Sequence, residues 1–444
     1  MASLNESSLS ARFGQLNMQQ SSGTSATLSS AVPPRRNRAQ PGRSRDDRML
    51  NGVGNLIKKI VVESSETQEE VSEEKVTIKS YESISSYSWK DIEHPTIYVP
   101  GLPPKLTPPT LPVQLQKDNL TRRKPRSPAA ALDPLFASLL HHHSSFSMSP
   151  IQLVTDRNSL RNILAFASAG SGKWRIDVDM INDTMFFSQW DEFMLMMING
   201  NQDSGFGHAF EDCVTTKEPE VEDSMHHERV VRYELGGLKC LVRFEADAYL
   251  SGIEDGDDEG GGASLATPPI DLPAPKPSRP VLRPPYKLVH VISRGHSIDP
   301  DLIAEIKSCA TRMFNINKTI PQLWFSQTRH LCVGYHKDGL VTRQLVMRDM
   351  KEELEKWEAE NQRQLRNMVR VIGEIREIAK RARKCTVVCM MVDGVKCLRV
   401  FERTRGVWLF VLVLWKNAGE FRENIGFSIR SVDVQLGGPV LLIS

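Results

Sequence analysis

The sequence predicts a mixed α/β (α+β) fold, in which flanking helices cover a mixed β-sheet core. Two observations carry the prediction. Short segments of alternating apolar and polar residues recur between residues 174 and 307, as in half-buried strands. A long charged stretch with helical spacing of its apolar residues follows at 348–384. Hydrophobic residues make up 40% and charged residues 25% of the 444-residue chain, as in a soluble protein with a disordered tail.

Charge, apolar runs and cysteines exclude several classes of protein. The net charge is +2, so bulk charge alone does not indicate a nucleic-acid binder. The longest apolar run, 407–415, has nine residues, whereas a membrane-spanning helix needs about 20. The first residues contain no apolar core of signal-peptide type. Seven cysteines without a regular framework favour a reducing compartment. We therefore expect no membrane partner.

Residues 1–79 are predicted to be a disordered basic and acidic tail. Residues 1–50 carry seven Arg against three acids and too few apolar residues to offset the entropy of ordering. Residues 63–75 are acidic and typical of a loop. The basic patch at 33–45 is either a solvated stretch or a signal for nuclear import or RNA-backbone contact. We expect a nuclear protein on the second interpretation and a cytoplasmic one otherwise.

A folded domain is predicted over residues 80–404. It opens with an extended strap at 95–109, because the six prolines of this segment forbid a helix. Two glycines at 236–237 and the Asp-Gly pair at 393–394 predict hairpin turns. Helices are expected at 132–140, 156–166 and 348–384, and strands at 174–179, 184–188, 230–233, 240–249, 287–292, 302–307, 385–392 and 395–402.

Two segments break this pattern. Residues 251–285 contain an acidic run, consecutive glycines and a proline-rich stretch, which together predict a flexible insertion between two strands. Residues 405–444 form a C-terminal extension without a convincing periodic element. This extension is either a strand that completes the sheet or the product of a mis-predicted exon.

Two charged pairs on neighbouring predicted strands form a candidate site. Glu245 and Asp247 are two residues apart, as are Glu305 and Lys307, so the members of each pair share a face. Carboxylate oxygens suit Mg²⁺ or Mn²⁺, which activate water and orient a phosphodiester. A lysine can hold the attacking water or stabilise charge on the phosphorus centre. These are the parts of a metal-dependent nuclease, although a solvated strand face gives the same pattern.

Five short segments follow one another between residues 151 and 341: VTDRNSL at 154–160, GHAFE at 207–211, FEAD at 244–247, EIK at 305–307, and WFSQ at 324–327 with VGY at 333–335. In this order they resemble the motifs of the DXO family of RNA 5′-end decapping exoribonucleases. The chain is similar to a divergent fungal member of that family. The resemblance implies a nuclease-like core over residues 80–404.

The resemblance also implies the metal ligands. Glu211, Asp247 and Glu305 would hold the cation, and Glu245 would ligate it through water. The implied cofactor is Mg²⁺ or Mn²⁺.

The remaining implied roles concern the substrate. Lys307 and Gln327 would position the scissile phosphate and the nucleophile, and Arg157 would contact RNA phosphate near the 5′ end. The implied reaction is metal-assisted attack of water on phosphate. It would remove incomplete or non-canonical caps, or degrade RNA in the 5′→3′ direction.

Three departures from the family pattern leave alternatives open. Gln327 lies one residue further from Trp324 than the family's glutamine, Tyr335-His336 replaces a Phe-Arg pair, and the insertion at 251–285 separates the two metal strands. The insertion and the shifted glutamine favour a catalytically degenerate protein that binds RNA or a partner nuclease as the main alternative, whereas the intact Glu-x-Asp and Glu-x-Lys pairs oppose it. A DNA-directed nuclease on a related core is another. RNA 5′ ends are the expected partner, with a nuclear 5′→3′ exoribonuclease as the candidate protein partner.

Overall fold

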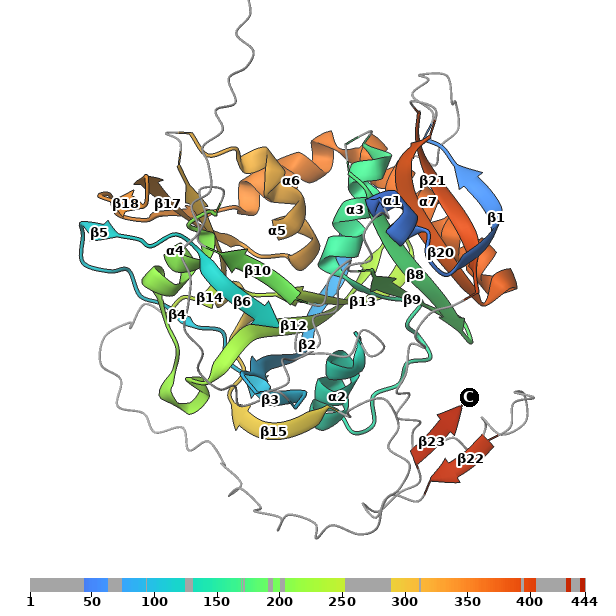
Figure 1. Ribbon diagram of the computed structural model, residues 1–444, viewed down its shortest axis with the longest axis horizontal. Coiled ribbons are helices and arrows are strands. Elements are labelled where there is room, and N and C mark those ends of the chain that lie inside the picture. The colour runs from blue at the N-terminus through green and yellow to red at the C-terminus, as the bar shows by residue number, and fades with distance from the viewer. Residues whose placement is uncertain are drawn as a thin grey trace, which may run out of the picture. The chain divides into compact units, whose positions relative to one another are not determined.

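Figure 1 shows the computed structural model of the chain. The structure describes residues 44–62, 74–92, 94–123, 131–168, 170, 172–190, 195–199, 204–251, 289–310, 313–392, 395–404, 429–432 and 440–443. The fold described below belongs to the unit Arg45–Ser444.

The larger of the two main sheets is mixed and has 11 strands. Its pairs β13–β7, β7–β9 and β15–β3 are parallel, and its other pairs are antiparallel. In spatial order the strands are β1 (Val53–Ile60), β21 (Val395–Arg403), β20 (Lys384–Val392), β8 (Trp174–Ile181), β9 (Thr184–Gln189), β7 (Leu153–Asp156), β13 (Leu238–Glu245), β12 (Ser224–Leu235), β2 (Ile78–Lys90), β3 (Thr96–Gly101) and β15 (His290–Gly295).

Helices cover both faces of this sheet. The helices of the described chain are α1 (Arg45–Met49), α2 (Asp133–His142), α3 (Arg157–Ala167), α4 (Gly207–Val214), α5 (Ile320–Ser326), α6 (Lys351–Glu360) and α7 (Gln362–Ala382). Successive strand residues point to opposite faces, so Val231 and Val242 join the core under α3 and α7. Their neighbours Val230 and Leu241 join the core under α2. Figure 1 shows α3 and α7 on one side of the sheet and α2 on the other.

The second main sheet has eight strands and is also covered on both faces. Cys332 packs with α4, whereas its neighbours Leu331 and Val333 pack with α5. The strands in order are β11 (Thr215–Thr216), β4 (Lys105–Leu106), β14 (Ala248–Tyr249), β16 (Ile303–Cys309), β17 (His330–Lys337), β18 (Leu340–Val341) and β5 (Val113–Gln114), with β19 (Val346–Asp349) also on β17. Two smaller antiparallel pairs join β6 (Asn119–Arg123) to β10 (Leu195–Asn199), and β22 (Ile429–Val432) to β23 (Val440–Ile443).

The predicted fold class is confirmed, and so are several elements. The expected hairpins are present as β12–β13 and β20–β21. The long helical stretch is present but is divided at Asn361 into α6 and α7. The predicted strand 240–249 is interrupted, because β13 ends at Glu245 and the chain then passes to the other sheet as β14.

The predicted N-terminal tail was wrong for residues 44–62 and for 74–79, where β2 begins. Helix α1 and strand β1 lie within it, and β1 pairs with β21 at the edge of the larger sheet. The physical reason is burial: Met49 and Ile60 are 0% and 2% exposed. A few well-placed apolar residues in a polar segment are enough to order it once a sheet edge is available.

Other predictions lie partly or wholly outside the described residues. Residues 1–43, 252–288 and 405–428 belong to this group, so the insertion and most of the C-terminal extension stay predictions. Within the described chain, none of the helices combines the length and the apolar character needed to cross a membrane. All seven cysteines carry free thiols.

Candidate active site

The candidate site lies where the chain passes from one main sheet to the other. The amide N–H of Ala246 still donates to the carbonyl of His227 on β12, at 2.9 Å. Two residues later the chain has joined the second sheet, where Ala248 pairs with Ala304 of β16. Asp247 stands at the crossing, and its Oδ2 accepts a hydrogen bond from the N–H of Ile306 at 2.8 Å. The crossing therefore brings Asp247 beside Glu305 and Lys307.

Glu305 is the most enclosed acid of the site. It is 2% exposed, and alternation along β16 turns it away from the face that Ile306 presents to α4. Its Oε1 accepts short contacts from the Lys307 ammonium and from the side-chain amide of Gln322. Its Oε2 lies 3.4 Å from Nη1 of Arg157. A buried carboxylate needs such partners, since an unpaired one would be strongly destabilising.

The ammonium of Lys307 joins the carboxylates of Asp247 and Glu305. It contacts Glu305 and lies 3.5 Å from Oδ2 of Asp247. Burial opposes its charge, but Glu305 and Asp247 outweigh burial and raise the pKa of Lys307. Lys307 is therefore a cation at neutral pH.

The two carboxylates differ in their protonation behaviour. Burial and then the charge of Glu305 raise the pKa of Asp247 well above its ordinary value. Burial also acts against the charge of Glu305, but Arg157 and Lys307 outweigh it and lower the pKa of that residue. Negative charge is thus concentrated on Glu305, and the charge of Glu305 makes ionisation of Asp247 less favourable.

Arg157 ties the site to the larger sheet. It is the first residue of α3, directly after β7, and is 8% exposed. Besides Glu305, its guanidinium donates to Oγ of Ser326 at 3.3 Å and to the carbonyl of Glu245 at 3.2 Å. It also stacks over the ring of Phe244, 5.2 Å from the centroid. The structure places this predicted RNA contact behind Glu305, as a buried support for the acid.

Glu211 is held near the site by the contacts that fix α4. The ring of Phe210 packs directly over Gly334 of β17, where a Cβ would lie 1.8 Å from the ring. The first turn of α4 is fixed by Asp118, whose carboxylate accepts from the N–H groups of His208 (3.3 Å) and Ala209 (2.9 Å). The charge of Glu211 then reaches the cluster, since it raises the pKa of Asp247 and Lys307.

Glu245 is the most exposed of the predicted acids, with 49% of its side chain accessible. Its Oε1 lies 2.9 Å from Nδ1 of His226 on the neighbouring strand. Its charge also raises the pKa of Asp247. Glu245 therefore lies near the cluster but in solvent, and its water-mediated role stays a prediction.

The donor set suits a hard divalent cation, but the ligands are not gathered around one point. Among the described residues, no group of three or more His, Cys, Asp or Glu side chains has the geometry to hold a metal ion. The ammonium of Lys307 instead lies between the two innermost acids. The oxygen donors fit Mg²⁺ or Mn²⁺ in kind, and such a cation would offset the charges of Glu305, Glu211 and Glu245 that act on Asp247.

Gln327 does not reach the acids. It ends α5 in the left-handed region, with φ 51°, and its side-chain amide donates to the carbonyl of Trp324 at 2.7 Å. Gln322, on the same helix, makes the contact with Glu305. Sequence reasoning missed the role of Gln322, because its partner Glu305 lies on another element and no local pattern relates the two. In the structure Gln322 shares a face of α5 with Ser326, four residues further on, which contacts Arg157.

Comparison with known protein families gives one match. A family described as a domain of unknown function, DUF8563, matches residues 55–406. The chain belongs to the DUF8563 family. The matched DUF8563 region starts within β1 and so includes part of the segment that was predicted to be a tail. A comparison with curated proteins found no match.

Several solved structures are similar to this DUF8563 chain at low identity. Rai1 of Scheffersomyces stipitis, in complex with (3′-NADP)+ and calcium ion, is 13% identical; the match covers 77% of this chain and 93% of that one, with a TM-score of 0.48. Candida albicans Rai1 with pU5 and Mn²⁺ is 12% identical; the match covers 79% of this chain and 93% of that one, with a TM-score of 0.45. K. lactis Dxo1 with manganese is 10% identical; the match covers 80% of this chain and 97% of that one, with a TM-score of 0.46. Rai1 and Dxo1 are proteins of the DXO family that the sequence resembles.

Proposed function

We propose that this chain is a divalent-metal-dependent hydrolase that acts on RNA 5′ ends. The observation that carries the proposal is the surplus of acids in the cluster around Asp247, Glu305 and Lys307. The charges of Glu211 and Glu245 also act on Asp247, so four acids face the two cations that contact the cluster, Lys307 and Arg157. Such a surplus of like charge raises the free energy of the folded state unless another cation joins it. The motif order in the sequence supports RNA as the substrate.

The metal would be held by Asp247, Glu305 and Glu211, with Glu245 bound through water. A bound Mg²⁺ or Mn²⁺ supplies an activated water and neutralises charge on phosphate. Because its pKa is raised, Lys307 stabilises negative charge on the phosphoryl oxygens and does not take a proton from water. Gln322 and Arg157 hold Glu305 in one orientation. This preorganisation lowers the cost of reaching the transition state.

The test is hydrolysis of RNAs that differ only at the 5′ end. Purified full-length protein is incubated with 5′-triphosphate, 5′-monophosphate, unmethylated-cap and NAD-capped RNA, with Mn²⁺, with Mg²⁺ or with EDTA. We expect metal-dependent release of the 5′ group or of nucleotides, and the preferred end names the substrate. Single-stranded DNA of the same sequence separates an RNA enzyme from a DNA-directed nuclease. Folded protein that turns over neither substrate would contradict the proposal.

The alternative is a degenerate relative that binds RNA or a partner nuclease without chemistry. It is favoured by the arrangement of the acids, since Glu305 is fully engaged by Lys307, Gln322 and Arg157. RNA binding without turnover would support this alternative. A nuclear 5′→3′ exoribonuclease as partner, and a nuclear location, are further proposals that rest on the basic patch at 33–45 and on the family resemblance.

A further inference from the structure

The two cations that contact the acidic cluster are both engaged within the protein. The guanidinium of Arg157 contacts Glu305 and donates to Oγ of Ser326 and to the carbonyl of Glu245, and only 8% of the residue is exposed. The ammonium of Lys307 lies between two acids of the cluster. An RNA phosphate that approaches this site from solvent therefore needs a further cation.

Arg161 stands one helical turn after Arg157 on α3. Residues four apart lie on the same side of a helix, with their Cβ atoms about 5–6 Å apart. Arg161 is half-buried and lies at one edge of the buried face of α3, between the buried Leu164 and the exposed Asn158. Arg157 reaches α5 from the same edge, and Figure 1 shows α3 and α5 next to each other. Long side chains on a helix lean toward its N-terminus, so Arg161 extends back over the turn that carries Arg157.

The charges that act on Arg161 agree with this position. Burial and then the charge of Arg157 lower the pKa of Arg161, whereas the charge of Glu305 raises it. Its guanidinium is thus close enough to the acidic site for Glu305 to act on it. Because burial and the like charge outweigh this acid, the positive charge of Arg161 is only partly compensated.

No partner in the described part of the chain holds the guanidinium of Arg161. It forms neither a hydrogen bond nor an ion pair with a described residue. None of the residues three or four positions away on α3 is an acid, so an ion pair along the helix is excluded. A salt bridge would explain a half-buried arginine at this place as a structural group, since charges removed from water need partners. Its absence favours a ligand that comes from outside the chain.

We propose that Arg161 binds a phosphate group of the RNA substrate on the solvent side of the acidic site. The guanidinium group matches phosphate geometry and binds two of its oxygens at once. The choice of RNA as the ligand rests on the proposed function. Arg161 thus takes the contact that the resemblance implied for Arg157, while Arg157 holds Glu305 from behind.

The experiment measures RNA binding without turnover. The probes are oligouridylates of about ten nucleotides with a 3′ fluorophore and a 5′-triphosphate, 5′-monophosphate or 5′-hydroxyl end, followed by anisotropy in EDTA with the full chain. Arg161→Gln removes the charge and keeps most of the side chain's length. Arg161→Lys keeps the charge and removes the planar fork.

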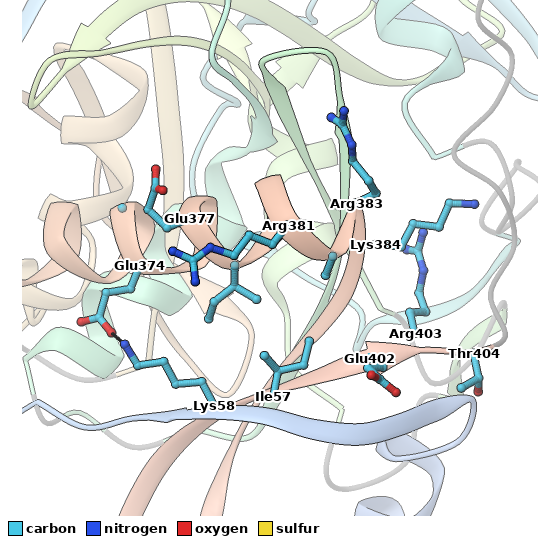
Figure 2. A pocket seen from close by; sticks show the side chains of 13 residues that line it. Ile57, Lys58, Glu374, Glu377, Arg381, Arg383, Lys384, Glu402, Arg403 and Thr404 are labelled. Atoms are coloured by element: carbon cyan, nitrogen blue, oxygen red, sulfur yellow. Dashed lines mark ion pairs between the residues drawn. The ribbon is translucent and has the colours of Figure 1, made fainter. Parts of the chain in front are cut away.

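The control is Arg381→Gln, which changes the net charge equally at an exposed helix arginine. Figure 2 shows Arg381 on α7, at a hollow between α7 and β1 that none of the residues of the acidic site lines. The control should bind every probe as wild type does.

We expect Arg161→Gln to bind RNA about tenfold more weakly, with an unchanged melting temperature. The slope of log Kd against log salt should fall by about 0.7, for one lost phosphate contact on a single strand. Arg161→Lys should keep the wild-type slope. A loss confined to phosphorylated probes would identify the 5′-terminal phosphate as the ligand, and an equal loss for all three probes would identify a phosphate between nucleotides; either supports the inference.

Three results would overturn the inference. They are wild-type binding by Arg161→Gln, an equal loss in Arg381→Gln, and a salt slope in Arg161→Lys as low as that in Arg161→Gln, because the effect would then not depend on the charge at this position.

Hydrolysis assays separate this inference from the proposed function. Arg161→Gln should raise KM about tenfold and leave kcat nearly unchanged, as expected for a group that binds substrate and transition state alike. If the chain hydrolyses no RNA but Arg161→Gln binds it poorly, only the proposed function fails. If wild type hydrolyses RNA and Arg161→Gln binds it like wild type, only this inference fails.

Discussion

Lys307 holds together two carboxylates that would otherwise repel each other. Coulomb repulsion between buried acids is strong because the surroundings screen it poorly. Burial and then this repulsion raise the pKa of Asp247, whereas attraction to Glu305 and Asp247 outweighs burial and raises the pKa of Lys307. The charge of the cluster, and with it the binding of a metal ion, therefore depends on single side chains.

Gln322, and not Gln327, should support catalysis. Gln322→Ala removes a hydrogen bond to the charged Glu305, and such bonds contribute about 1.5–3 kcal/mol. We expect kcat for RNA hydrolysis to fall about 10- to 100-fold. Gln327→Ala, which removes only a bond to the carbonyl of Trp324, is the matched control and should fall less than about threefold. Steady-state kinetics of the two variants decide, and the reverse order would restore the role that the resemblance gave to Gln327.

His227 should make folding stability depend on pH. It is 3% exposed, its Nδ1 lies 3.0 Å from Oγ of Ser88, and its Nε2 has no partner among the described residues. Burial, with the charge of Arg229, lowers its pKa well below 6.5. Below about pH 6.5 the unfolded chain therefore binds a proton that the folded chain does not, and stability falls as pH falls.

Urea unfolding at several pH values tests this. Wild type should lose up to about 1.4 kcal/mol per pH unit below pH 6.5 relative to His227→Gln. Above that pH the two proteins should differ by a constant amount. Parallel curves across the whole range would show that His227 titrates in the folded state.

At the scale of elements, the packing of α4 on β17 is close, because the ring of Phe210 lies directly over Gly334. Gly334→Ala places a methyl group within 1.8 Å of the Phe210 ring, so α4 must shift or the ring must move. Overpacking of this kind destabilises by about 1–3 kcal/mol. We expect a lower melting temperature and weaker metal-dependent activity, since Glu211 moves with α4.

The second-site variant Phe210→Leu provides the control for that prediction. In the Gly334→Ala background it should recover part of the lost stability, because the smaller side chain makes room for the methyl group. Differential scanning fluorimetry on the four proteins of this cycle measures the coupling. Strictly additive effects would mean that Phe210 and Gly334 do not interact as described.

Elements were largely predictable from the sequence, but their junctions were not. The hairpins and the long helices follow from turn residues and periodicity, which are local signals. The passage of the chain between sheets at Asp247 is a tertiary event, since Glu245 and Asp247 belong to one alternating pattern but not to one strand. The acids Asp247 and Glu305 were therefore paired correctly, although β14 and not β13 brings them together.

Across the whole unit Arg45–Ser444, the chain passes several times between two mixed sheets, and the acidic site lies at the passage from β13 to β14. Sequence reasoning predicted the domain but assigned β1 to the tail. The segment Val53–Ile60 is a strand because it pairs with β21, and its sequence alone does not indicate that pairing. Gln322 was missed for a similar reason: its partner Glu305 comes from another element. Contacts between distant segments are what a single sequence hides.

Deleting residues 1–62 should destabilise the protein. The deletion removes β1 from the edge strand β21, together with the buried side chains of Met49 and Ile60. Arg175 also loses the carbonyls of Met49 and Asn51 as acceptors, at 3.0 and 2.7 Å. Two buried apolar side chains contribute about 3–6 kcal/mol together. Chemical unfolding checks this against a control that lacks residues 1–43; equal stability of the two truncated proteins would contradict the role of β1.

The most direct test of the acidic site combines metal binding and turnover in the same samples. Wild type, Asp247→Asn and Lys337→Met, a control at an exposed lysine of β17, are titrated with Mn²⁺ and followed by electron paramagnetic resonance. Hydrolysis of 5′-triphosphate RNA is measured alongside. We predict that wild type and Lys337→Met bind Mn²⁺ and hydrolyse RNA with the same metal dependence. Asp247→Asn, folded to the same extent, should lose the tight Mn²⁺ site. Its rate of RNA hydrolysis should fall at least about 100-fold. Undiminished Mn²⁺ binding and turnover in Asp247→Asn would contradict the assignment of this cluster as the catalytic site.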